Sequence, residues 1–133
     1  MRIIRFNYLP HHKTYVPVVP FFIKGKVGWK EVWAYVDSGA AYTILSSDEA
    51  GRLDIDYSCG KKGMTMVGDG NLIPVFFHKL DIEIGGILFR ATIAFSTNLG
   101  VGFNLLGRKD IFDRFEVVFN DPKRLITFRE TKR

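Results

Sequence analysis

The chain has 133 residues, of which 47% are hydrophobic and 14% aromatic, a composition that excludes a disordered protein and suffices for one apolar core. Its formal net charge is +5, but the positive residues are scattered, so a solvated surface is favoured over a nucleic-acid-binding stripe. The single cysteine, Cys59, excludes an internal disulfide, and a reducing, cytoplasmic location is the expectation that fits it.

No apolar segment of the sequence reaches the roughly 20 residues that a membrane-spanning helix needs. The longest, "YVPVVPFFI", is interrupted by Pro17 and Pro20. The N-terminal stretch "MRIIRFNYLPHH" lacks a sustained apolar core, so neither a signal peptide nor a lipid anchor is expected. We therefore expect residues 1–133 to form a single domain with an N-terminal arm over 1–14, and no membrane partner.

Short runs of β-branched and aromatic residues, separated by dense turn signals, predict a mostly β chain. A first hairpin is expected from residues 15–24 and 29–37, joined by the turn "GKVG". Alternation along its second strand places two sets of residues on opposite faces: Val32, Ala34 and Val36 on one, and Trp33, Tyr35 and Asp37 on the other.

Next in the chain, Ser46 and Glu49 have the spacing of a capping box, which predicts one short helix in "SSDEAGRLDI". A second hairpin is predicted over "GMTMVGDGNLIPVFF", with its turn at residues 68–71. A third follows in "HKLDIEIGGILFRATIAF", where apolar and acidic residues alternate before the Gly85–Gly86 turn.

The last third of the chain predicts a buried strand end in "NLLGR" and then a helix from Gly107, in which Ile111, Phe112 and Phe115 share a face. A fourth hairpin closes the chain in "FEVVFNDPKRLITF", around residues 120–123. This succession of hairpins indicates a compact, closed sheet.

One carboxylate interrupts an apolar strand, Asp37 in "EVWAYVDSGAAYTIL". An ionised aspartate in an apolar wall costs several kcal/mol unless it is paired, solvated or neutralised. The "DSGA" motif, Thr43 three residues beyond it, the glycine-bearing hairpin "MVGDGN" and the later "NLLGR" together resemble the retropepsin-like aspartic proteases. That family contains the retroviral proteases and their cellular and bacterial relatives, and the resemblance covers about residues 15–128.

The resemblance implies an all-β fold, a closed retropepsin-like barrel of hairpins with one or two short helices. It also implies an aspartic endopeptidase that acts on peptide or protein substrates as a homodimer, since the chain carries one such motif and the second aspartate must come from another copy. The two Asp37 carboxylates would share one proton, one acting as base on a water and the other as acid toward the scissile carbonyl. No cofactor is implied.

The site residues that the resemblance implies fall into three groups. The catalytic loop would use the Asp37 carboxylate, hydroxyl hydrogen bonds of Ser38 across the two-fold axis, and the close backbone approach that Gly39 permits. Substrate contacts would come from Ala40, Ala41 and a flap at Val67, Gly68, Asp69 and Gly70. An ordinary tight β-turn would require the same residues at the tip of this hairpin. Structural support would come from Thr43, Gly107 and Arg108.

The sequence departs from the viral pattern at Ala41, where viral members carry an acidic residue that pairs with the arginine of the Gly-Arg helix. Arg108 therefore lacks that partner, and Asp110 and Asp113 are candidates for the role. A catalytically weak or inactive dimer of the same fold, acting as a peptide-binding or assembly module, is the alternative. Nucleic-acid binding is a third hypothesis that depends on the net charge alone.

The remaining polar residues favour plain interpretations. His11 and His12 would point to opposite faces of a strand and His78 is distant, so no metal site is expected. Cys59 has no histidine close in sequence and is not expected to be a nucleophile, and Met64 and Met66 are expected to pack on the core or the substrate side. We expect the C-terminal hairpin, residues 115–129, to take part in the dimer interface.

Overall fold

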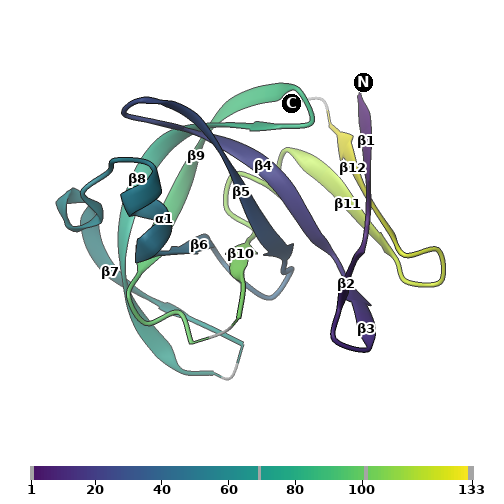
Figure 1. The fold of residues 1–133 in the computed structure, drawn as a ribbon, viewed down its shortest axis with the longest axis horizontal. Helices are drawn as coiled ribbons and strands as arrows, with labels where there is room; N and C mark the ends of the chain where they lie inside the picture. The colour runs from purple at the N-terminus through teal and green to yellow at the C-terminus, as the bar shows by residue number, and fades with distance from the viewer. Residues whose placement is uncertain (1, 69, 101, 132–133) are drawn as a thin grey trace.

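The computed structural model describes residues 2–68, 70–100 and 102–131, and nearly all of its regular structure is strand (Figure 1). The strands of the larger sheet are β4 (Val18–Gly25), β5 (Gly28–Val36), β6 (Thr43–Ser46), β7 (Lys61–Met66), β8 (Leu72–Ile84), β9 (Ile87–Ser96) and β10 (Asn104–Leu106). The others are β1 (Ile3–Asn7), β2 (Leu9–His11), β3 (Thr14–Val16), β11 (Phe115–Asn120) and β12 (Leu125–Glu130). Two short helical segments occur, α1 (Ser47–Arg52) and the 3-10 turn η1 (Tyr57–Cys59). The prediction of a mostly β chain is confirmed.

The larger sheet closes on itself. Its strand order is β4-β5-β10-β6-β9-β8-β7, and β8 also pairs with β4, so the ring runs from β4 through β5, β10, β6, β9 and β8 back to β4. The short strand β10 lies parallel to β5 and antiparallel to β6, which brings the segment after residue 103 into the middle of the sheet. The β7–β8 hairpin extends outward from this ring.

A second, three-stranded sheet has the order β1-β12-β11, and β2 and β3 form a separate small hairpin. Strand β1 pairs antiparallel with β12 along its whole length, from Ile3 opposite Arg129 to Asn7 opposite Leu125. The first and last strands of the chain therefore lie side by side, on the right in Figure 1. Strands β1 and β11 are the two edge strands of this sheet.

The core follows from the alternation of apolar residues along these strands. Its main cluster lies within the ring and extends to the three-stranded sheet, and its largest fully buried members include Phe21, Phe95, Phe115 and Phe128. A smaller cluster lies between the segment after Asp37 and the β7–β8 hairpin: Ala40, Ile44, Ile73, Val75, Ala94, Leu99 and Leu105. Nowhere in the described ranges is a helix both long and apolar enough to span a membrane.

All four predicted hairpins form, as the pairs β4–β5, β7–β8, β8–β9 and β11–β12. In β5 the two predicted faces differ in burial: Val32, Ala34 and Val36 are at most 1% exposed, whereas Trp33 on the opposite face is 43% exposed. The local alternation of residue types therefore predicted correctly both the strands and which residues of β5 share a face.

The helix predicted from Gly107 is wrong, because residues 109–114 form consecutive turns. Asp110 has a φ of 66°, which is incompatible with a continuous right-handed helix. Ile111 and Phe115 are nevertheless buried and Phe112 packs partly against the main core cluster, as their shared apolar character requires.

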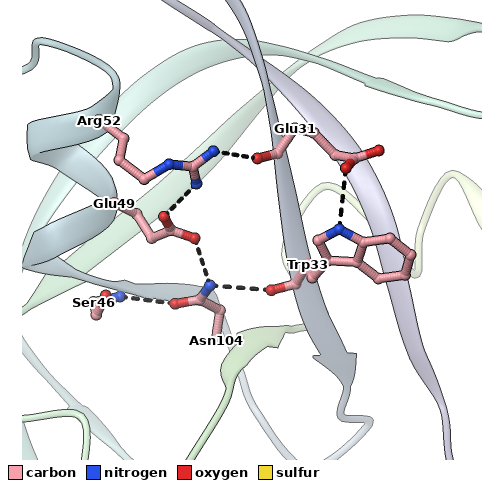
Figure 2. A network of polar contacts seen from close by, with 6 residues as sticks. All are labelled: Glu31, Trp33, Ser46, Glu49, Arg52 and Asn104. Carbon is pink, nitrogen blue, oxygen red and sulfur yellow. Dashed lines mark hydrogen bonds and ion pairs between the residues drawn. The ribbon is translucent and has the colours of Figure 1, made fainter. Parts of the chain in front are cut away.

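The predicted capping box is also wrong in its contacts, although α1 does begin directly after Ser46. The Ser46 side chain makes no capping hydrogen bond. Its main-chain N–H donates instead to the Asn104 side-chain oxygen at 3.0 Å, and the Glu49 carboxylate accepts from Asn104 and from Arg52 (Figure 2). A residue from another strand thus replaces the local cap.

Candidate active site

Asp37 directly follows the last residue of β5, and hydrogen bonds from two other segments fix its backbone. The Asp37 N–H donates to the Leu106 carbonyl of β10 at 3.0 Å, and the Val36 N–H donates to the Pro17 carbonyl at 2.9 Å. The apolar strand thus delivers the carboxylate to the end of the sheet, where Asp37 is half-buried rather than enclosed.

The Asp37 carboxylate lies over a tight turn made by the residues that follow it. Its Oδ1 accepts a hydrogen bond from the Gly39 N–H at 2.8 Å, and the Ala40 N–H donates to the Asp37 carbonyl at 3.2 Å. A Cβ on Gly39 would lie 3.2 Å from that same Oδ1, so a side chain there would crowd the carboxylate. The position favours glycine for this close approach.

Asp37 and Ser38 border an open hollow of about 360 Å³. The other residues that line it are Tyr15, Pro17, Tyr35, Val36, Phe119 and Asp121. Because the carboxylate is partly solvated and has a backbone N–H donor, its position at the end of an apolar strand does not carry the full cost of burying a charge.

Thr43 and Gly107 join the turn to β10. The Gly107 N–H donates to Thr43 Oγ1 at 3.1 Å, and both residues are buried. A Cβ on Gly107 would lie 2.8 Å from the Ala40 carbonyl oxygen and closer still to that of Tyr42, so no side chain fits there. Ala40 is only 3% exposed, which leaves little room for a larger residue at the base of the loop.

Arg108 supports the Asp37 loop through main-chain carbonyls rather than through a carboxylate. Its N–H donates to the Ala40 carbonyl at 2.9 Å, and its guanidinium Nη1 donates to the Ser38 carbonyl at 3.3 Å. The guanidinium also lies over the Phe112 ring, 5.3 Å from its centroid. The next residue, Lys109, continues this pairing with an N–H bond to the Ala41 carbonyl at 2.9 Å.

Asp110, one of the two candidate partners for Arg108, has other contacts. Its Oδ2 accepts from the Thr92 N–H at 2.8 Å and lies 3.9 Å from Lys79 Nζ. Partial burial acts to raise the pKa of Asp110, but the hydrogen bonds from Thr92 and the charges of Lys79 and Lys109 outweigh it and hold this pKa below its usual range. Asp110 therefore binds residues 109–114 to β9 and does not pair with Arg108.

The predicted flap is the tip of the β7–β8 hairpin. The tip is closed by two backbone bonds, from the Val67 N–H to the Asn71 carbonyl at 3.0 Å and from the Gly70 N–H to the Val67 carbonyl at 2.8 Å. Gly70 has a φ of 85°, a conformation that favours glycine. Gly68 is exposed at the same tip, and Asp69, also predicted here, lies outside the described residues.

The two faces of this hairpin differ in character. Thr65 and Ile73 point inward and are 5% and 7% exposed, and Ile73 lines a hollow of about 370 Å³ between the tip and residues 98–100. Met64 and Met66 point outward and are 56% and 58% exposed, so the expectation that they pack on the core is wrong, whereas the alternative, packing on the substrate side, stays a prediction. The alternation of the strand places them on the outer face.

Asn104 is a supporting residue that the sequence pattern did not reveal, although it begins the "NLLGR" motif. Its side-chain Nδ2 donates to the Trp33 carbonyl at 3.0 Å and to Glu49 Oε2 at 2.8 Å, while its Oδ1 accepts from Ser46 (Figure 2). One amide therefore ties β5, β10 and the start of α1 together. The available signal was a polar residue at the start of an otherwise buried strand.

The histidines and the cysteine lie apart from this loop. The His11 ring packs on His12 and on Phe103, with centroid distances of 4.2 and 4.7 Å, and His78 Nε2 lies 2.8 Å from the Tyr57 carbonyl oxygen. No group of three or more His, Cys, Asp or Glu residues suited to hold a metal ion occurs in the described part of the chain.

The Cys59 thiol is exposed and donates to Asp56 Oδ2 at 3.3 Å. This hydrogen bond and the Asp56 charge raise the pKa of Cys59. A raised pKa keeps the sulfur protonated, which disfavours a role as nucleophile.

Two solved protease structures have a similar fold. A retropepsin-like aspartic protease from Rickettsia conorii matches with a TM-score of 0.65 at 18% identity, over 96% of this chain and 91% of that chain. The EIAV protease in complex with the inhibitor HBY-793 matches with a TM-score of 0.57 at 19% identity, over 79% of this chain and 93% of that chain. No protein-family model and no curated protein matches the sequence. The chain has the retropepsin-like fold, and this prediction is confirmed.

Proposed function

We propose that this chain is an aspartic endopeptidase that works as a homodimer, with one Asp37 from each copy. The observation that carries the proposal is the position of Asp37, half-buried at the end of β5, with one carboxylate oxygen held by the Gly39 N–H and an open hollow beside it. The retropepsin-like fold supports this assignment, because the "DSGA" motif lies at a sheet end where the Asp37 N–H donates to the Leu106 carbonyl of β10.

The surface beside Asp37 supports a dimer. Tyr15 and Phe119 line the hollow that contains Asp37 and are 43% and 39% exposed, and Val118, which precedes Phe119 in β11, is 45% exposed. Strand β11, which carries Val118 and Phe119, pairs with β12 alone among the described strands, so its other edge is open. A second copy related by a two-fold axis would cover these apolar side chains and pair the edge.

In such a dimer, two carboxylates close together cannot both ionise at little cost, so the pair would hold one proton. The ionised Asp37 would take a proton from a water molecule while the oxygen of that water attacks the carbonyl carbon of the peptide bond. The protonated Asp37 would donate to the carbonyl oxygen, giving a neutral diol. A proton returned to the amide nitrogen would then release the amine and the acid.

The neighbouring residues would have positioning roles in this reaction. Ser38 is exposed at the rim, where its hydroxyl could bond to the partner copy, and Arg108 holds the Ser38 carbonyl. The β7–β8 hairpin would close over an extended peptide, with Gly68 and Gly70 supplying the conformational freedom at its tip.

A dimer of the same fold that binds peptides without cleaving them is the second candidate. Arg108 is bound to a backbone carbonyl instead of an acidic partner, and Ala41 supplies only a methyl group where a polar side chain could have bound the substrate backbone. This candidate predicts peptide binding without hydrolysis.

The test compares wild type with Asp37→Asn in hydrolysis of an unfolded protein between pH 4 and 7, with sedimentation to measure the assembly state. We expect dimers of both and no detectable hydrolysis by Asp37→Asn. Asp121→Asn is the matched control, because it changes another carboxylate of the same hollow and should retain hydrolysis. Cleavage by Asp37→Asn, or full activity of a monomer, contradicts the proposal, whereas a wild-type dimer that binds peptides without cleaving them favours the second candidate.

A further inference from the structure

A second open hollow, of about 430 Å³, is lined by residues that directly follow the "DSGA" motif and by residues from the segment 108–113, and its side chains carry a net positive charge. We call it the Arg108 pocket, and its lining residues are Ala41, Tyr42, Arg108, Lys109, Phe112 and Asp113. Two cations therefore face one carboxylate. Tyr42 and Phe112 provide apolar walls, and Ala41 adds a methyl group.

The Arg108 guanidinium has unused hydrogen-bonding capacity in this pocket. Its one hydrogen bond to another described residue is the 3.3 Å contact from Nη1 to the Ser38 carbonyl, although a guanidinium has five N–H donors. The ion pairs between described residues involve neither Arg108 nor Lys109. Stacking on Phe112 limits the motion of the guanidinium, which prepares it to bind a carboxylate.

Tyr42 connects the Arg108 pocket to the base of the flap hairpin. Tyr42, five residues after Asp37, lines the pocket and also packs on Phe77 of β8 with a centroid distance of 4.7 Å. A peptide held in extended form between Asp37 and the β7–β8 hairpin would therefore pass this pocket. At about 3.3 Å per residue, the side chain that reaches it belongs to a residue two to four positions from the cleaved bond.

We infer that the Arg108 pocket is an outer specificity site that selects an acidic residue of the peptide substrate. Glutamate fits it better than aspartate, because its longer apolar stem can lie against Phe112 and Tyr42 while its carboxylate reaches Arg108 and Lys109. A lysine at the same substrate position meets two like charges and is rejected. The inference rests on the proposed protease function and names a class of substrate for that same site.

The test uses one peptide scaffold in which Glu, Gln or Lys is placed in turn at the four positions on each side of the cleaved bond. At one or more of these positions, we expect kcat/KM of the Glu peptide to be about 5-fold higher than kcat/KM of the Gln peptide, which is the size expected of an exposed charge pair. The Lys peptide should have the lowest kcat/KM of the three. Lys109→Glu should reverse this order. Ala41→Asp should abolish it by placing a carboxylate beside Arg108. Lys24→Glu, the same charge change at an exposed lysine of β4 outside the pocket, should leave the preference unchanged.

A second readout separates this inference from the proposed function. Fluorescence anisotropy measures binding of the same peptides to Asp37→Asn dimers, which are not expected to cleave them. A preference for Glu in binding without any hydrolysis by wild type contradicts the protease function and retains the acidic-residue site. Hydrolysis with equal kcat/KM for Glu and Lys at every position, an unchanged preference in Lys109→Glu, or no peptide binding in either assay overturns the inference.

Discussion

The main-chain N–H of Asp37 donates to the carbonyl of Leu106 at 3.0 Å, and this bond joins the "DSGA" loop to the strand that begins with Asn104. Two segments far apart in the chain therefore fix the position of one carboxylate. Because Leu106 is directly followed by Gly107 and Arg108, which both contact the loop, the stability of this junction should be sensitive to single substitutions.

Gly107→Ala should lower the free energy of unfolding by about 3 kcal/mol or more, because the new methyl group would meet the backbone carbonyls of Ala40 and Tyr42, which cannot move aside cheaply. Urea denaturation measures the loss. Gly51→Ala in α1 is the control, since a Cβ there meets nothing within 4 Å and should be neutral or stabilise by about 0.5–1 kcal/mol. Equal stability of the two variants would contradict the close packing at Gly107.

Thr43→Val should destabilise the fold by about 1–3 kcal/mol, because it leaves the buried Gly107 N–H without its acceptor while keeping the side-chain shape. Thr43→Ser retains the hydroxyl and should lose less. Thermal or urea unfolding of the two variants checks this order. If Thr43→Val were more stable than Thr43→Ser, the hydroxyl would not contribute to stability.

Asn104→Asp should destabilise the protein in a pH-dependent way. The new carboxylate would face Glu49 Oε2, to which the Asn104 amide donates at 2.8 Å, so two like charges would meet near neutral pH. At low pH one of them takes up a proton, so the deficit in unfolding free energy should shrink as the pH falls from 7 toward 4. Asn104→Leu, which has no charge, is the control and should show a deficit that does not change in this way.

The raised pKa of the Tyr8 phenol should add to the free energy of unfolding at neutral pH, and this addition should disappear at strongly alkaline pH. Burial, then the hydrogen bond to Asp121 at 2.7 Å and the charge of that carboxylate, raise the pKa of Tyr8 from its usual 10.0 to about 12. The folded state therefore holds the phenol proton more tightly, and this contribution is complete below pH 10 and is lost as the pH rises toward 12. Urea midpoints of wild type should fall more steeply over that range than those of Tyr8→Phe. Identical slopes would contradict the raised pKa.

Phe119→Lys should weaken the proposed dimer without unfolding the chain, because Phe119 is 39% exposed on the outer strand β11. We expect the dimer dissociation constant to rise at least about 10-fold, with hydrolysis falling in parallel, since the side chain lies beside Asp37 at the expected interface. Sedimentation at several concentrations measures this. Leu88→Lys on β9, 66% exposed away from the hollow, should leave the dimer intact, and a similar effect of both changes would place the interface elsewhere.

Local patterns in the amino-acid sequence were sufficient to predict the hairpins and the loop motif. Alternation along β5 and β8 and the turn glycines are local signals, because a strand places successive side chains on opposite faces and a tight turn needs residues that adopt positive φ. The "DSGA" and "NLLGR" motifs indicated the retropepsin-like fold because they too are local signals. Each is a contiguous stretch that can be recognised without knowing which other segments it contacts.

Which distant groups meet depends on long-range contacts that local patterns do not contain. The helix predicted after Gly107 does not form, because Asp110 adopts a left-handed backbone conformation and its carboxylate accepts a hydrogen bond from the Thr92 N–H of β9. Asn104 bonds β5 and α1, contacts that no sequence pattern suggested, and Arg108 bonds the Ser38 carbonyl instead of the acidic partner that the family pattern suggested. Each of these contacts joins residues far apart in the chain, and their energies depend on how the strands close the ring, which no local window of sequence contains.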